Sequence, residues 1–267
     1  MEPEFTQVVN AIKQAGARAL DLAKLGFGVQ TKKDRSPVTT ADLEVNRILH
    51  EMQQVHFPGD GWLSEETPDD PARLAKTRVW IVDPIDGTKA YVNRLPEFCI
   101  SVALVERGQP VLAAIFNPST DELFTAVRGH GLRLNGRPIA PSPPHDATSL
   151  VMVSPWEFRN GRWAGFDRHV QCRPMLSIAN ALSMVAAGRV QATLTIEPEN
   201  EWDLAAGTLL IEETGGTIAD AEGQTLTFNQ PTPRFHGVIA VAATASQELR
   251  ALLQAHADQA RTKSKRP

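Results

Sequence analysis

Carboxylate side chains gather in three short segments of this sequence, S-E-E at 64–66, D-P-I-D-G-T at 83–88 and E-W-D at 201–203. The middle segment directly follows T-R-V-W-I-V at 77–82, whose β-branched content predicts a strand. Sites in α/β proteins are commonly built where strands end. These segments are therefore the first candidates for a functional site.

The segment 83–88 combines two carboxylates with a feature that binds anions. Pro84 and Gly87 favour a tight turn that would direct Asp83 and Asp86 to the same side. Gly87 and Thr88 would open a short helix, whose unpaired N–H groups attract an anion, phosphate above all. The two carboxylates would repel that anion unless divalent cations lay between them. Hard oxygen ligands without thiolates point to Mg²⁺.

Each segment also has a purely structural interpretation. D-x-x-D-G is a turn with helix-capping acids, and the pair Glu65-Glu66 is typical of a wetted surface. Asp203 is a favoured residue at the start of a helix. The occurrence of all three segments in this order favours one shared site.

Composition excludes several classes of protein. The chain has 267 residues, 42% of them apolar, and 27 Lys and Arg against 31 Asp and Glu give a net charge of −4. This mild acidity argues against a general nucleic-acid binder. Cys99 and Cys172 form no C-x-x-C, which argues against a thiolate zinc site and favours buried thiols in a reducing compartment. The sequence also lacks the G-x-S-x-G and Walker-type motifs.

The chain shows no signal for secretion or membrane insertion. Its first residues, M-E-P-E, are acidic and polar, unlike the start of a secretion signal. No apolar run approaches the ~20 residues of a transmembrane helix. We therefore expect a cytoplasmic protein with no membrane partner.

Periodicity predicts a mixed α/β chain in two halves. In the first half we expect helices over 5–25 and 41–55, a polar loop over 31–40, and strands over 77–82, 99–106, 111–117, 123–127 and 132–134. In the second half we expect strands over 150–154, 190–196, 217–219 and 238–242, and helices over 177–188, 203–214 and 246–257. Prolines at 138, 141, 143 and 144 mark the boundary. The predicted units are 1–140 with the first two acidic segments, 145–260 with the third, and a disordered basic tail at 261–267.

The acidic segments, together with S-P-V-T-T-A-D at 36–42 and W-D-L-A-A-G at 202–207, resemble the signature of the inositol monophosphatase superfamily. The resemblance covers most of the chain. It implies a mixed α/β (α+β) fold, the layered α/β/α/β/α sandwich of the inositol monophosphatase and fructose-1,6-bisphosphatase type. It also implies a Mg²⁺-dependent, lithium-sensitive phosphomonoesterase with two to three ions in each active site.

The resemblance also implies roles for single residues. The first Mg²⁺ would be held by Glu65, Asp83 and the backbone carbonyl of Ile85, the second by Asp83, Asp86 and Asp203, and a weaker third ion would lie near Glu65. Catalysis would fall to Asp42, Glu65 and Thr88, with Asp42 and the Thr88 hydroxyl orienting and deprotonating the attacking water. The substrate would meet Asp86, Gly87, Thr88, Glu197 and Asp203. The Gly87 and Thr88 amides would take the phosphate, and Glu197 a sugar or inositol hydroxyl; a surface acid at a strand end is the other interpretation of Glu197.

The sequence leaves three candidate substrates open. Lys89, Glu97-Phe98 and Glu201 resemble the 3′(2′),5′-bisphosphate nucleotidases, which favours hydrolysis of 3′-phosphoadenosine 5′-phosphate to AMP and phosphate. Arg173 and Lys89 are candidate contacts to a second phosphate. Length and Ile85 fit inositol-1-monophosphatases equally well, and histidinol phosphate is the third candidate.

Partners are expected to be few. We expect a small phosphate monoester as substrate and no nucleic acid, and the resemblance admits a homodimer. A catalytically inactive binding or regulatory protein on the same fold is the alternative. That alternative predicts missing carboxylates, whereas Glu65, Asp83, Asp86 and Asp203 are all present.

Overall fold

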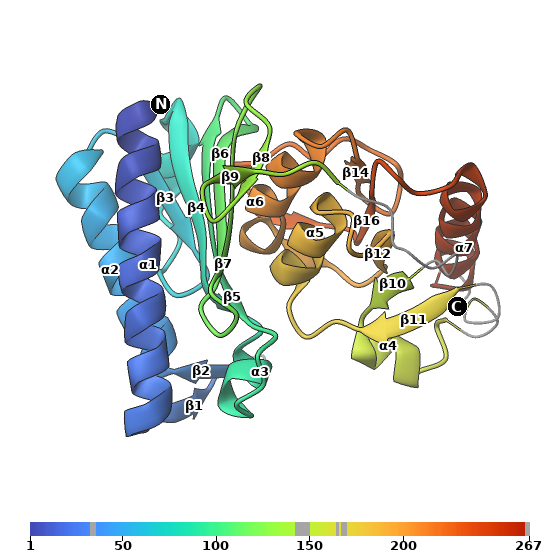
Figure 1. The fold of residues 1–267 in the computed structure, drawn as a ribbon, viewed down its shortest axis with the longest axis horizontal. Coiled ribbons are helices and arrows are strands. Elements are labelled where there is room, and N and C mark those ends of the chain that lie inside the picture. The colour runs from blue at the N-terminus through green and yellow to red at the C-terminus, as the bar shows by residue number, and fades with distance from the viewer. Residues whose placement is uncertain (33–35, 142–149, 164–165, 167–169, 265–267) are drawn as a thin grey trace.

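The computed structural model describes residues 1–32, 36–141, 150–163, 166 and 170–264, and its layers alternate between helices and sheets. Helices α1 (Glu2–Leu25) and α2 (Thr40–His56) cover one face of a seven-stranded sheet. Helices α5 (Ile178–Ala186) and α6 (Glu201–Glu212) lie between this sheet and a five-stranded one, and α7 (Gln247–Ser264) lies outermost (Figure 1). The predicted layered α/β/α/β/α sandwich is confirmed.

The first sheet has the strand order β3-β4-β5-β6-β7-β8-β9. Its strands are β3 (Gly61–Ser64), β4 (Arg78–Asp86), β5 (Cys99–Glu106), β6 (Gln109–Asn117), β7 (Glu122–Val127), β8 (Leu132–Leu134) and β9 (Arg137–Pro138). Only the β3–β4 pair of this sheet is parallel. The inner strand β5 reads C-I-S-V-A-L-V-E because both of its faces are covered by helices.

The second sheet has the strand order β11-β10-β12-β16-β14. Its strands are β10 (Leu150–Val153), β11 (Gln171–Pro174), β12 (Ala192–Thr195), β14 (Thr217–Ala219) and β16 (Val238–Val241). β10 is parallel to β11 and β12, and β16 is antiparallel to β12 and β14. In the chain, the strands of the first sheet precede residues 142–149 and those of the second sheet follow them. These residues, which include the predicted boundary prolines 143 and 144, lie outside the described ones.

The buried helices α5 and α6 pack unusually closely, which lets one core connect the two sheets. A Cβ added at Gly207 of α6 would lie 2.4 Å from Leu182 Cδ1 of α5, so only glycine allows this approach. The same apolar cluster contains Ile81 and Ala113 of the first sheet and Ala240 of the second. The centre of the molecule is therefore continuous across the two halves.

Several shorter elements were not expected from the sequence. They are β1 (Val29–Thr31), β2 (Pro37–Thr39), a 3₁₀ helix at Pro71–Ala75, α4 (Pro155–Arg159), β13 (Glu199–Asn200) and β15 (Arg234–Phe235). The short helix expected after Gly87 is present as α3 (Thr88–Val92). The predicted polar loop at 31–40 is wrong at both ends, because β1 and β2 pair as an antiparallel ribbon with Gln30 opposite Val38. Extended Val and Thr residues favour this pairing.

A helix enters the basic tail at 261–267, whose predicted disorder stays a prediction. Helix α7 continues to Ser264, into the predicted disordered stretch, and 265–267 lie outside the described residues. The segment 247–264 contains no glycine or proline, and its Ala, Gln, Arg and Lys residues favour a helix. Among the described residues, we find no helix with the length and apolar content to span a bilayer.

Candidate functional site

A β-bulge in β4 changes the direction of the side chains between Asp83 and Asp86. Asp83 pairs with Ser101 of β5, and Asp86 pairs with Cys99. Moving three residues along β4 therefore corresponds to moving two residues along β5. In a regular strand, residues 83 and 86 would point to opposite faces. The extra residue changes that direction, as bulges beside active sites do. The strand thus runs through to Asp86, and the predicted turn after 77–82 is replaced by this bulge.

Asp83, Asp86 and Asp203 converge. Each offers one carboxylate oxygen, and these oxygens lie within 4.8 Å of one another. The three residues are only 1%, 8% and 8% exposed. Asp83 Oδ1 is buried without a hydrogen-bond partner in the described part of the chain. An unpaired buried carboxylate oxygen is costly, so this arrangement favours a bound cation.

Two of the predicted acids complete capping boxes at helix starts. Asp42 Oδ2 accepts the N–H of Thr39 at 2.7 Å, and Asp203 Oδ2 accepts the N–H of Asn200 at 2.7 Å. Each aspartate is the third residue of its helix, α2 or α6. The capping interpretation of Asp203 is thus correct for one of its oxygens, and the other is left to the acidic cluster.

The start of α5 holds Asp86 in the same manner. Asp86 Oδ2 accepts the Ser177 hydroxyl at 2.6 Å and the Ala179 N–H at 2.6 Å. Ser177 is the N-cap of α5, and its Oγ also accepts the Asn180 N–H at 3.1 Å. The central helix layer therefore fixes the orientation of this carboxylate.

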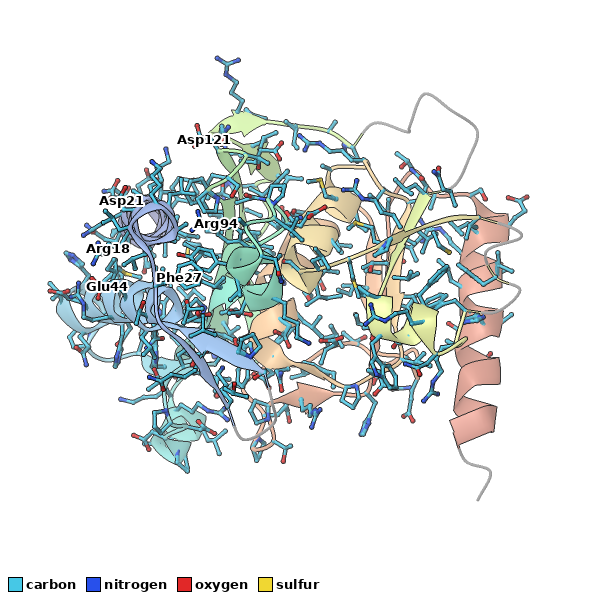
Figure 2. All side chains as sticks on the ribbon, turned by 90° about the horizontal axis from the view of Figure 1, so that it is seen from below. Arg18, Asp21, Phe27, Glu44, Arg94 and Asp121 are labelled. Atoms are coloured by element: carbon cyan, nitrogen blue, oxygen red, sulfur yellow. The ribbon has the colours of Figure 1, made fainter. Side chains whose placement is uncertain are left out.

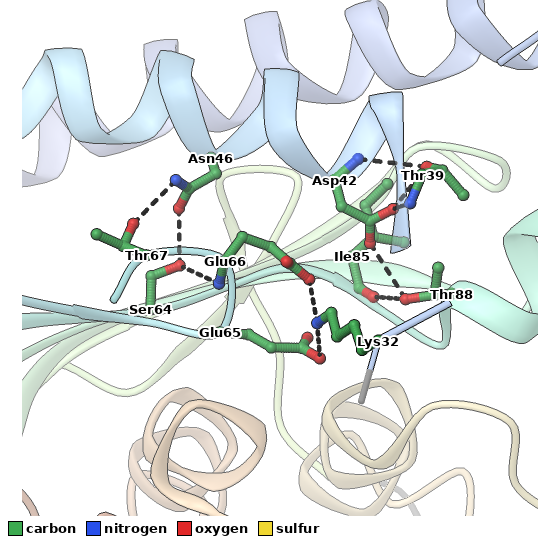
Figure 3. A network of polar contacts seen from close by, with 10 residues as sticks. All are labelled: Lys32, Thr39, Asp42, Asn46, Ser64, Glu65, Glu66, Thr67, Ile85 and Thr88. Carbon is green, nitrogen blue, oxygen red and sulfur yellow. Dashed lines mark hydrogen bonds and ion pairs between the residues drawn. The ribbon is translucent and has the colours of Figure 1, made fainter. Parts of the chain in front are cut away.

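A lysine bridges the two glutamates of segment 64–66. Lys32 Nζ lies 2.7 Å from Glu65 Oε1 and 2.5 Å from Glu66 Oε1 (Figure 3). Lys32 comes directly after β1. The Ser64 hydroxyl, by donating to Asn46 Oδ1 at 2.7 Å, ties the same segment to α2. The β1–β2 ribbon is thus electrostatically attached to the acidic site.

Asp42 and Thr88 form the predicted pair. The Thr88 hydroxyl lies 3.1 Å from Asp42 Oδ1 and 3.0 Å from the carbonyl oxygen of Ile85 (Figure 3). Asp42 is fully buried. The structure therefore brings together a carboxylate, a hydroxyl and the backbone carbonyl of Ile85, which was predicted as a ligand.

Gly87 is required by the turn into α3. Its φ is +87°, and a Cβ there would lie 2.9 Å from the carbonyl oxygen of Glu97 and 3.0 Å from that of Leu176. Any other residue would be strained and would push these carbonyls away. Gly87 is the N-cap of α3, so the N–H groups at its start lie directly after Asp86.

Burial dominates the electrostatics of the cluster. It raises the pKa of Asp83 well above its usual value, and the charges of Glu65, Asp86 and Asp203 add to this. Burial, with the charges of Asp86 and Glu65, does the same to the pKa of Asp203. Burial also raises the pKa of Asp86 to about 6, although the bonds from Ser177 and Ala179 lower it. A cation would favour the ionised form of each acid.

The donor set fits a hard divalent cation. All candidate ligands are carboxylate or carbonyl oxygens, and no described cysteine or histidine belongs to the cluster. Asp83 Oδ1 supplies a buried oxygen with no other partner among the described residues. The residues present thus fit Mg²⁺, the ion expected from the sequence.

Glu197 and Glu199 have different surroundings. The Glu197 carboxylate lies 3.6 Å from Arg162 Nη2, and its role towards a substrate hydroxyl stays a prediction. Glu199 stands four residues before Asp203 in the chain, and burial and the charges of Asp203 and Asp86 raise the pKa of Glu199 well above its usual value.

One residue beside the acidic segments, Lys32, escaped sequence reasoning. Lys32 lies outside these segments, and a lone lysine in a polar stretch carries no distinguishing signal. Ser177 belongs to the predicted helix 177–188, where a serine at the start indicates a cap.

The residues that suggested a nucleotidase have other contacts. Glu201 is fully buried and accepts the N–H groups of Asn229 and Gln230, each at 2.7 Å. Glu97 pairs with Arg173 at 3.3 Å, which satisfies one of the cations considered for a second phosphate. These contacts give structural reasons for two of the marker residues.

Comparison with known proteins gives a consistent result. The model of the "Inositol monophosphatase family" matches residues 1–262. An inositol-1-monophosphatase of Rhizobium meliloti (strain 1021) is 36% identical over 227 residues, which are 81% of this chain and 85% of that protein. A protein of Salmonella typhimurium (strain LT2) named Nus factor SuhB is 30% identical over 84% of this chain and 87% of its own length.

Solved structures agree with the fold. A Thermotoga maritima IMPase superposes with a TM-score of 0.82 at 25% identity, covering 97% of this chain and 100% of that one. The likeness therefore spans both sheets and all five layers.

Proposed function

Since this chain belongs to the inositol monophosphatase family, we propose that it is a Mg²⁺-dependent phosphomonoesterase acting on a small polyol phosphate. The observation that carries the proposal is the buried, unpartnered Asp83 Oδ1 beside the oxygens of Asp86 and Asp203, considered among the described residues. Such a cluster is electrostatically unfavourable by itself and fits a cation-dependent reaction. A cytoplasmic location, a homodimeric state and the absence of nucleic-acid and membrane partners belong to the same proposal.

The proposed ligands follow from the described contacts. Glu65, Asp83 and the Ile85 carbonyl would hold one ion; Asp83, Asp86 and Asp203 would hold a second, with a third near Glu65. Bound Mg²⁺ supplies Lewis-acid charge to phosphoryl oxygens and makes a water molecule more acidic.

The protein's own groups then position the reacting parts. Asp42, held at Oδ2 by Thr39, would accept a proton from the attacking water through the Thr88 hydroxyl, which lies 3.1 Å from Asp42 Oδ1. The Gly87 and Thr88 N–H groups would take phosphate oxygens. No covalent nucleophile is needed for this reaction.

Inositol 1-phosphate is the substrate we propose first. The Rhizobium meliloti relative is named an inositol-1-monophosphatase, and Glu201 and Glu97 have structural partners here. The 3′(2′),5′-bisphosphate nucleotidase activity is the second candidate, because Lys89 is exposed directly beside Thr88. Histidinol phosphate is the third.

The test compares phosphate release from inositol 1-phosphate, 3′-phosphoadenosine 5′-phosphate and histidinol phosphate. We expect release to need Mg²⁺, to stop with chelator, to fall with millimolar Li⁺ and to be fastest on inositol 1-phosphate. Asp86→Asn should abolish release from all three while the protein stays folded. Equal rates on all three substrates would contradict the proposed preference, and release unaffected by chelator would contradict the metal site.

A binding protein without activity is the alternative from another class. The relative named Nus factor SuhB raises it, because that name describes no hydrolysis. The complete set of acids argues for the enzyme. Calorimetric binding of Mg²⁺ and of inositol 1-phosphate, with no phosphate released over many hours, would favour the alternative.

A further inference from the structure

A cavity separate from the acidic site lies between α3 and the C-terminal part of α1. Its volume is about 320 Å³, and its apolar lining consists of Leu20, Ala23, Tyr91, Leu95, Pro96 and Phe98. This size is at the lower end for small-molecule sites. It is apolar, unlike the acidic site on the other end of α3.

The apolar surface of this cavity is fixed by packing. The Tyr91 ring contacts Phe27 and Phe98, with centroids 4.8 Å and 5.0 Å apart. The Tyr91 hydroxyl donates to the carbonyl oxygen of Ala19 at 2.7 Å, which ties α3 to α1. A ligand would therefore meet a preformed wall, with little conformational cost on binding.

Two cations flank the apolar wall. Lys24 and Arg94 both line the cavity and are exposed. Figure 2, in which α1 is seen end-on, shows Arg94 beside the end of this helix. Within the described ranges, neither cation has an ion-pair partner within 4.0 Å, and no carboxylate is among the lining side chains. Arg94 has a φ of +57°, a conformation that is uncommon outside glycine.

We propose that this cavity binds a small amphipathic monocarboxylate, with its apolar chain against Leu20, Leu95 and Pro96 and its carboxylate between Lys24 and Arg94. An arginine and a lysine at one rim match a single carboxylate in charge and in hydrogen-bond donors. Besides the two cations, the polar lining side chain is Ser119, whose single hydroxyl is too little to bind a sugar, and no described lining carboxylate is present to bind a metal ion. The site is separate from the proposed phosphatase function.

The ligand would contact the helix that carries a catalytic hydroxyl. Tyr91 lies one turn after Thr88 in α3, and Thr88 bonds to Asp42. Tyr91 is also the only tyrosine of the chain. A label on tyrosine therefore reports on the wall that α3 contributes to this cavity, and the charge-removing variants show whether a shift comes from the cavity.

The experiment uses the full-length protein with tyrosine carbon-13-labelled at the ring Cζ alone, which gives one NMR resonance. Octanoate, titrated below its micelle concentration, should shift that resonance and saturate. Octanol, which has the same chain without the charge, should bind at least about tenfold more weakly. A resonance that does not move, a shift that does not saturate, or equal affinity for octanol would overturn the proposal.

Charge-removing variants give the second arm. The double variant Lys24→Gln/Arg94→Gln should weaken octanoate binding about tenfold or more and leave octanol binding unchanged. The matched control Lys13→Gln/Arg137→Gln removes the same charge from exposed positions outside the cavity. Equal octanoate affinity in the two double variants would show that net charge, and not this rim, holds the ligand.

Discussion

Asp42 and Asp203 hold the same position, the third residue, in two helices on opposite faces of the seven-stranded sheet. In each, Oδ2 accepts the N–H of the N-cap residue at 2.7 Å. The cap thus fixes the orientation of each carboxylate through Oδ2 and leaves Oδ1 for other contacts. The site is assembled from helix starts that meet at the end of β4.

The first prediction concerns charge at one of these caps. Asp203→Asn keeps an oxygen for the Asn200 N–H but removes the charge, so the fold should persist. Phosphate release should fall about 100-fold or more, because the proposed Mg²⁺ loses an anionic ligand. The measurement is phosphate release at saturating Mg²⁺, with folding checked by circular dichroism.

Asp70→Asn is the matched control for this cap. Asp70 Oδ1 accepts the Ala72 N–H at 2.9 Å at the start of the 3₁₀ helix 71–75, in another part of the molecule. Its activity should stay at the wild-type level. Near-normal activity of Asp203→Asn would show that this carboxylate does not hold the ion.

The second prediction concerns pH. Burial raises the pKa of Asp86 to about 6, so between about pH 4 and pH 6 the folded state binds more protons than the unfolded state. The free energy of unfolding of the metal-free protein must therefore fall as pH rises through this window, by about 1.4 kcal/mol for each pH unit crossed. Urea unfolding with chelator at several pH values measures this.

Mg²⁺ and a variant provide the checks on this slope. Saturating Mg²⁺ should reduce the decline, because the cation stabilises the ionised form of Asp86. Asp86→Asn should make the metal-free decline shallower, and the raised pKa values of Asp83, Asp203 and Glu201 should keep part of it. A metal-free protein whose stability rises from pH 4 to pH 6 would contradict the burial argument.

The sequence was informative where a residue type is required by local geometry. The acids of 64–66, 83–88 and 201–203 and the glycine at 87 were found because turns and caps restrict residue choice, and strand 99–106 because its apolar run is continuous. The bulge in β4 was not predictable, since it depends on the register with β5. Lys32 was missed because only tertiary packing brings it beside the acids.

The third prediction tests the lysine bridge. Lys32→Gln removes the cation that contacts Glu65 and Glu66, leaving two neighbouring carboxylates uncompensated. The metal-free protein should lose about 1–2 kcal/mol of unfolding free energy, since the three side chains are partly buried. The pKa of Glu66, already raised to about 7 by burial, should rise further because Lys32 lowers it.

Chemical denaturation with chelator and titration of Glu66 by carbonyl NMR provide the measurements. Arg47→Gln, which breaks an exposed pair with Glu51 on α2, is the control and should leave stability unchanged. If the two variants behaved alike, the Lys32 bridge would carry no more weight than a surface pair.

The fourth prediction separates the Thr88 hydroxyl from its packing. Thr88→Val removes the bond to Asp42 at 3.1 Å but keeps the shape, so kcat should fall about 100-fold. Thr88→Ser keeps the hydroxyl and should recover most of the activity. Steady-state kinetics on inositol 1-phosphate measure both, and a Val variant as active as the Ser variant would remove the hydroxyl from the mechanism.

The last prediction concerns Glu201, whose place before Trp202-Asp203 suggested a nucleotidase. Its two oxygens accept the N–H groups of Asn229 and Gln230, and burial raises its pKa to about 7. Glu201→Gln cannot accept both bonds and places an amide N–H₂ against a backbone donor, so it should cost about 1–3 kcal/mol of stability.

Because Glu201 faces the 229–230 backbone, its replacement should leave substrate choice unchanged. The ratio of kcat/KM for inositol 1-phosphate to that for 3′-phosphoadenosine 5′-phosphate should match the wild type, measured well below the lowered Tm. A changed ratio with unchanged stability would reverse this assignment and return Glu201 to the substrate pocket. The stability and the ratio of kcat/KM values change independently. Losing a buried backbone contact lowers the free energy of unfolding, whereas losing a pocket contact changes the ratio.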